Sequence, residues 1–124
     1  MIDLNQYFDP VCLDRPEIAH IRGAAGFSHN IYVNTGNEPI GDISGFTAAF
    51  IGVPDDRASM NTGAAHAPDT IRKNLYSFSR LPGKMKIADL GNLRPGTAFE
   101  DTLAGLRDVL SLLLDHEIVP IILG

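Results

Sequence analysis

The polar residues that could carry chemistry gather in one glycine-containing loop, PDDRASMNTGAAHA, which spans Pro54–Ala67. This loop offers carboxylates, a guanidinium, an amide and an imidazole, from Asp55, Asp56, Arg57, Asn61 and His66. It is long for a connection between a strand and a helix, where about 2–6 residues are usual. Because the loop follows an apolar run of strand length, we expect it at the ligand-binding edge of an α/β sheet.

Two interpretations of this loop are open. In the first, Asp56, Arg57 and Asn61 lie at the mouth of a site and bind a small-molecule substrate. In the second, Asp56 and Arg57 form a local ion pair, while Asn61 and Gly63 shape turns. We predict substrate binding for Asp56, Arg57 and Asn61, and we assign no residue of this chain a catalytic role.

The chain offers no recognisable metal-ligand motif. A hard divalent ion needs three or more convergent oxygen or imidazole ligands, and the adjacent Asp55 and Asp56 supply only two carboxylates. The His-x-Asp, Asp-x-His and His-Glu-x-x-His spacings are absent, and the histidines at 20, 29 and 116 are dispersed. We therefore predict no metal ligand within these residues.

Composition and motifs argue against several other classes of function. The 124 residues include 15 acidic and 10 basic side chains, for a net charge of −5, which disfavours a nucleic-acid partner. The apolar stretches are shorter than the roughly 20 residues that cross a bilayer, so we expect no membrane span. A phosphate-binding G-x-x-x-x-G-K-[ST] or G-x-G-x-x-G motif is absent, so a nucleotide-binding flavodoxin-like domain is our third choice.

Hydrophobic periodicity predicts alternating strands and helices. The runs at 46–53, 85–91 and 118–123 are typical of strands, and they are separated by helices expected at 68–78 and from about 97 to 114. Thr97 and Glu100 have the spacing of a capping box for the second helix. This order predicts an α/β fold with a parallel sheet, because strand–helix–strand crossovers are right-handed.

The remaining elements are shorter. We predict that residues 1–44 form an N-terminal wrap with one short helix at 16–22, and that residues 45–124 form the α/β part. We expect Gly91 to close the second strand. Asp89 and Asn92, around its end, face the same cleft as the loop, or Asp89 instead satisfies backbone donors at a turn. Three strands and two helices make about half of a doubly wound sheet, so we expect unpaired strand edges.

The segment FIGVPDDRASMNTGAAHAPDTIRKNLY, followed by KIADLGNLRPGTAFEDTLAGLRDVLSLLLDHEIVPIILG, resembles the N-terminal half of the ureohydrolases, the arginases, agmatinases and formimidoylglutamases. The strand end at Ile51–Pro54, the Asn-x-Gly-Ala loop and Ala67–Arg72 match the family pattern G-x-P…G-A…G-P-x-x-I-R. Asp89–Asn92 and the terminal IVPIILG extend the match, which covers residues 46–124. The formimidoylglutamases are the branch that the chain resembles most.

The resemblance implies a three-layer α/β/α arginase-like fold and a centre with two manganese ions at the carboxyl edge of the sheet. A metal-bridging hydroxide there attacks an amidine or guanidinium carbon. In the family the first metal histidine follows the strand that matches Ile118–Gly124, so we expect the metal-binding motifs beyond Gly124 and no manganese in this chain by itself. The chain departs from the family pattern at two places. Ala67 stands where the family has a glycine, and the loop arginine of many formimidoylglutamases has no clear counterpart here. Both departures bear on which substrate is bound.

Together these features predict the N-terminal fragment of a manganese-dependent hydrolase of linear C–N bonds, formimidoylglutamase-like, cytoplasmic and homo-oligomeric. The alternative is a non-catalytic ureohydrolase-like module for binding or assembly. For the isolated chain the unpaired sheet edges predict self-association.

Overall fold

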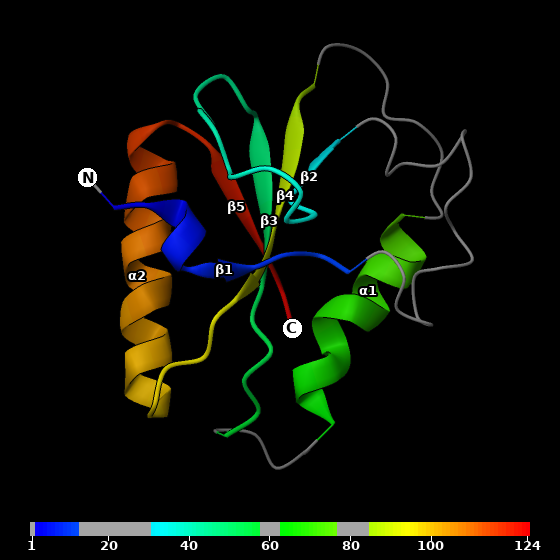
Figure 1. The fold of residues 1–124 in the computed structure, drawn as a ribbon, viewed down its shortest axis with the longest axis vertical. Helices are drawn as coiled ribbons and strands as arrows, with labels where there is room; N and C mark the ends of the chain where they lie inside the picture. The colour runs from blue at the N-terminus through cyan, green and yellow to red at the C-terminus, as the bar shows by residue number, and fades with distance from the viewer. Residues whose placement is uncertain (1, 13–30, 58–62, 77–84) are drawn as a thin grey trace.

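A computed structural model describes residues 2–12, 31–57, 63–76 and 85–124 of the chain. The predicted helix at 16–22 lies outside these residues. The described residues form these elements (Figure 1), in the order η1 (Leu4–Gln6), β1 (Phe8–Asp9), β2 (Tyr32–Val33), β3 (Ala48–Gly52), η4 (Ala64–His66), α1 (Ala67–Leu75), β4 (Ile87–Leu93), α2 (Phe99–Asp115) and β5 (Val119–Leu123), where η denotes a 3₁₀ helix.

The sheet has β3 at its centre, between β4 and β5, and both neighbours run parallel to it. On the far side of β4, the short strand β2 pairs in parallel with its first residues and β1 pairs antiparallel with its last ones. Helices α2 and α1 lie on opposite sides of the sheet (Figure 1). The predicted α/β fold with a mostly parallel sheet is confirmed.

Burial explains why the central strand is an almost continuous apolar run. All five residues of β3 are buried, because the strand is covered on both faces. On one face Ala49 and Ile51 belong to a core that also contains Val109 and Leu113 of α2. On the other face Ala48 and Phe50 pack in a second core with Tyr76, which follows α1.

Two local predictions were wrong. Gly91 does not close its strand, because β4 continues to Leu93, and Gly91 adopts a φ of +103° where a Cβ would lie only 2.2 Å from the Asp9 carbonyl oxygen. Thr97 and Glu100 do not cap α2. Asp101 does so instead, because its Oδ2 accepts a hydrogen bond from the Ala98 N–H at 3.0 Å.

Within residues 1–44, for which we predicted a wrap with one short helix, the strands β1 and β2 both join the sheet. Each has only two residues, which is too short for a periodic pattern to reveal. Asn34, the residue after β2, ties the end of this strand to β4, because its Nδ2 donates to the Leu90 carbonyl oxygen at 2.9 Å. Within the described ranges, no helix has the length and apolar character that a membrane span requires.

A buried arginine joins α1 to β4. The Arg72 and Asp89 side chains are both 0% exposed, and they form a two-pronged pair, Nε to Oδ2 at 2.8 Å and Nη2 to Oδ1 at 2.9 Å. Nη1 donates to Asp69 and Asn92, and Nη2 also donates to the Gly91 carbonyl oxygen. All five guanidinium N–H groups therefore have an acceptor, as burial of this cation demands.

The Asp89 carboxylate has two further donors, the Tyr76 hydroxyl and the Gly91 backbone N–H. Burial first, and then the charge of Asp89, raise the pKa of Tyr76 far above its ordinary value of 10.0, so the phenol stays protonated and donates. Of the two interpretations of Asp89, the structure supports the one in which it satisfies donors within the fold. We call Arg72, Asp89, Tyr76, Asp69 and Asn92 the Arg72 cluster.

Removing one member of the buried pair is predicted to be costly. Arg72→Met leaves the Asp89 carboxylate buried without its cation, so we expect the free energy of unfolding to fall by about 3–5 kcal/mol in urea titrations. Arg94→Gln is the matched control, because the Arg94–Asp9 pair is exposed by 51% and 59% and such pairs contribute about 0–1 kcal/mol. Equal losses in the two variants would contradict a structural role for the buried pair.

The edge strand β5 leaves apolar side chains uncovered within the described part of the chain. Val119, Ile121 and Ile122 are 57%, 37% and 48% exposed. The Val119 N–H donates to the Thr47 carbonyl and the Leu123 carbonyl accepts from Val53, so these groups face β3. The Ile122 N–H and the Pro120 nitrogen therefore point to the open side. Pro120, which lacks an N–H, fits an edge position.

The exposed apolar strand predicts self-association of the isolated chain. We expect light scattering to show species larger than a monomer at micromolar concentration, because an open strand edge with apolar flanks pairs with other chains. Ile122→Lys should shift the population towards monomer, whereas Met85→Lys, a change at an exposed methionine before β4, should not. A stable monomer at all concentrations would contradict this expectation.

Candidate functional site

The carboxyl ends of β3 and β5 converge on the start of α1. Gly52 ends β3, and a Cβ built there would lie 2.0 Å from Asn92 Oδ1 and 2.9 Å from Pro68 Cβ. Gly124 follows β5, and a Cβ there would lie 2.9 Å from the Val53 carbonyl oxygen and 3.3 Å from Pro68 Cγ. Because these two positions lack a Cβ, Pro68 in the first turn of α1 packs directly against the ends of β3 and β5.

Gly52→Ala should destabilise the protein, since the added methyl group has no space beside Asn92 and Pro68. We expect a loss of about 1–3 kcal/mol in the free energy of unfolding, measured by urea denaturation. Gly41→Ala is the control, because a Cβ at Gly41 meets nothing within 4 Å. If Gly52→Ala lowered the free energy of unfolding no more than Gly41→Ala does, the close packing of Pro68 against β3 would be contradicted.

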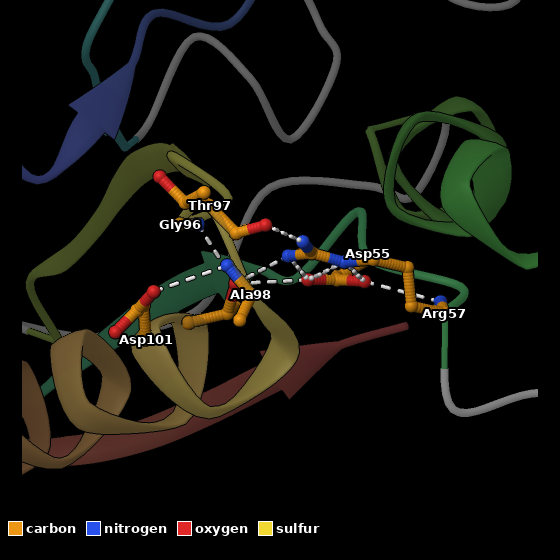
Figure 2. Close-up of polar contacts among 7 residues, drawn as sticks. Asp55, Arg57, Gly96, Thr97, Ala98 and Asp101 are labelled. Carbon is orange, nitrogen blue, oxygen red and sulfur yellow. Dashed lines mark hydrogen bonds and ion pairs between the residues drawn. The ribbon is translucent and has the colours of Figure 1, made fainter.

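The first residues of the loop after β3 form a charged cluster that reaches α2 (Figure 2). Arg57 Nε donates to both oxygens of Asp55, at 2.9 and 3.2 Å, and Nη2 also contacts Asp55 Oδ2. The Asp55 side chain is 2% exposed and the Arg57 side chain 38%. The aspartate is thus nearly enclosed, while its partner still reaches the surface.

Thr102, buried in the first turns of α2, anchors this pair. The Thr102 hydroxyl donates to Asp55 Oδ2 at 2.8 Å. The Thr102 hydroxyl oxygen also accepts from Arg57 Nη2 at 3.0 Å and from the Gly96 N–H at 2.9 Å. Arg57 Nη1 donates to the Thr97 carbonyl oxygen at 2.8 Å. We call Asp55, Arg57, Thr102 and the Thr97 carbonyl the Asp55 cluster.

The contacts of the Asp55 cluster favour an ionised aspartate. Hydrogen bonds from the Arg57 side chain are the largest effect, and with those from the Arg57 backbone and Thr102 they hold the pKa of Asp55 well below its ordinary value of 3.8, although desolvation opposes the shift. The Arg57 guanidinium in turn has a raised pKa, because of the same hydrogen bonds. The pair therefore stays charged on both sides at neutral pH.

The three predicted substrate-binding residues, Asp56, Arg57 and Asn61, differ in where they lie and what they contact. Arg57 lies at the surface of this edge, but its ion pair is with Asp55 and not, as the local alternative supposed, with Asp56. Asp56 is half-buried and makes no hydrogen bond or ion pair within the described residues. Asn61 lies outside those residues. His66 is exposed and precedes α1 without a side-chain capping bond.

Sequence reasoning missed two residues of this edge. Thr102 lies 47 positions from Asp55, and a threonine in the first turn of an amphipathic helix gives no signal of so distant a partner. Arg72 was noted only as part of a family motif. A charged residue on the inner face of a short helix is the signal that could have revealed it, because full burial of arginine requires partners.

The comparison with protein-family models decides the family. The model of the arginase family matches residues 46–124, a segment that holds β3, α1, β4, α2 and β5. The chain belongs to the arginase family. The resemblance inferred from the sequence is thereby confirmed at family level, with a ureohydrolase-type hydrolase as the function that membership indicates. Neither the curated proteins nor the solved structures contain a significant match.

Arginase-family proteins generally depend on manganese, so the side chains of this edge were tested against that metal. Among residues 2–12, 31–57, 63–76 and 85–124, no group of three or more His, Cys, Asp or Glu side chains could hold a metal ion. Asp55 is occupied by Arg57 and Thr102, and Asp89 by Arg72 and Tyr76. These residues do not fit a manganese centre, so no reaction step is assigned to a metal held by them.

Proposed function

We propose that this arginase-family chain is the N-terminal portion of a manganese-dependent hydrolase of linear amidine or guanidine C–N bonds, of the formimidoylglutamase type. The match over residues 46–124 is the observation that carries this proposal. We also propose, from the resemblance, a cytoplasmic homo-oligomer. Manganese would be bound by residues other than those described, and when bound it supplies a hydroxide nucleophile at neutral pH.

The contribution of this chain is to shape one wall of the site. The strands β3 and β5 run parallel, so their carboxyl ends lie at the sheet edge where α/β proteins bind ligands. The loop after β3 begins at that edge with Asp55, Asp56 and Arg57. In the proposal Asp56, Arg57 and Asn61 contact the polar end of the substrate, while Asp55 serves the fold.

Loss of the Arg57 cation is predicted to weaken binding of an acidic substrate. In a full-length hydrolase that contains this chain, Arg57→Ala should raise the KM for formimidoylglutamate by about tenfold or more, the effect of losing one charge-assisted hydrogen bond. The kcat should change little, because the residue binds the part of the substrate that does not react. An unchanged KM would remove Arg57 from the substrate site.

Manganese content is the direct test of the proposed chemistry. After incubation with manganese and dialysis, elemental mass spectrometry should find about two ions per chain in a full-length protein that contains these residues. Assays with formimidoylglutamate, agmatine and arginine then identify the substrate. A full-length protein without metal and without activity on all three would contradict the proposal and favour the non-catalytic module.

A further inference from the structure

The Asp55 cluster joins two parts of the chain that the proposed site needs in a fixed relation. Asp55 and Arg57 lie in the loop after β3, whereas Thr97 lies just before α2 and Thr102 in its first turns, 40 or more residues later. Figure 2 shows the Arg57 guanidinium directed at the turn before α2, with the Asp55 carboxylate beside it. A substrate-binding arginine held in this way does not need to be ordered when the substrate arrives.

We propose that Asp55 and Thr102 are positioning residues that hold Arg57 in a single pose at the mouth of the site, an inference that rests on the proposed function. Neither residue contacts substrate in this account. Asp55 takes two nitrogens of the guanidinium, Thr102 accepts from one of them, and the Thr97 carbonyl accepts from the third. These contacts fix the plane of the guanidinium as well as its place.

The burial of the partners separates this arrangement from an ordinary surface ion pair. The Asp55 side chain is 2% exposed and Thr102 is 1% exposed, so water competes weakly for their side-chain oxygens. An exposed pair exchanges partners readily and contributes little, as expected for Arg94 and Asp9. Arg57 keeps 38% of its side chain exposed, which leaves part of it accessible from solvent.

The adjacent residues Asp55 and Asp56 differ in their contacts. Asp55 has its oxygens occupied by Arg57 and Thr102, whereas Asp56 makes no hydrogen bond or ion pair within the described residues. Asp55 therefore belongs to the scaffold of the loop. Among the described residues, the Asp56 carboxylate is not used by the fold.

The test follows the Arg57 Nε–H resonance by NMR at neutral pH in the ¹⁵N-labelled chain that carries Ile122→Lys, the change expected to favour the monomer. Asp55→Asn should speed exchange of this proton with water by about tenfold or more, because a charge-assisted hydrogen bond is lost. Asp56→Asn is the matched control and should leave the exchange rate as it is. Unchanged exchange in Asp55→Asn would overturn the proposal.

Two features keep the test decisive if Asp55→Asn disturbs the fold. The buried Arg72 Nε–H, bonded to Asp89, reports in the same spectrum whether the chain is folded. The pair Thr102→Val and Thr102→Ser then isolates the hydroxyl, since serine should restore slow exchange and valine should not. Equal exchange in these two variants would also overturn the proposal. The experiment contains no substrate or metal, so its failure is distinct from failure of the ureohydrolase assays.

Discussion

A single buried cation constrains the rest of this structure. The Arg72 guanidinium is fully enclosed, and an arginine can be enclosed only if every N–H group finds an acceptor and its charge finds a counterion. Those acceptors come from α1 through Asp69 and from β4 through Asp89, Gly91 and Asn92. The places of α1 and β4 therefore depend on each other, and their contacts stabilise the carboxyl edge of the sheet.

The loop between β3 and α1 is consequently held at both ends. At its far end, Pro68 sits on Gly52 and Gly124, and the Arg72 cluster fastens the same helix to β4. At its near end, Asp55 and Arg57 bind Thr102 and the turn before α2. In an arginase-family protein this edge is where a ligand is expected, so the two clusters define the frame within which Asp56 and the rest of the loop would meet substrate.

Sequence patterns predicted those parts of the fold that depend on periodicity. The apolar run of β3 and the amphipathic pattern of α2 are local properties, and both elements are present. The short strands β1 and β2 were beyond reach because two residues carry no period. Gly91 was misjudged as a stop because sequence does not show that Asp9 approaches its backbone. The partner of Arg57 was also misplaced, since Thr102 stabilises Asp55 from a distant position.

The central claim is that Arg72 and Asp89 act as one unit, and a double-mutant cycle tests it most directly. The free energies of unfolding of the parent, Arg72→Met, Asp89→Leu and the double variant would be measured in urea. We expect a coupling energy of about 1–3 kcal/mol, with the double variant more stable than the sum of the single losses implies. A coupling energy near zero would mean that the two side chains stabilise the fold independently, and the account of this sheet edge would be contradicted.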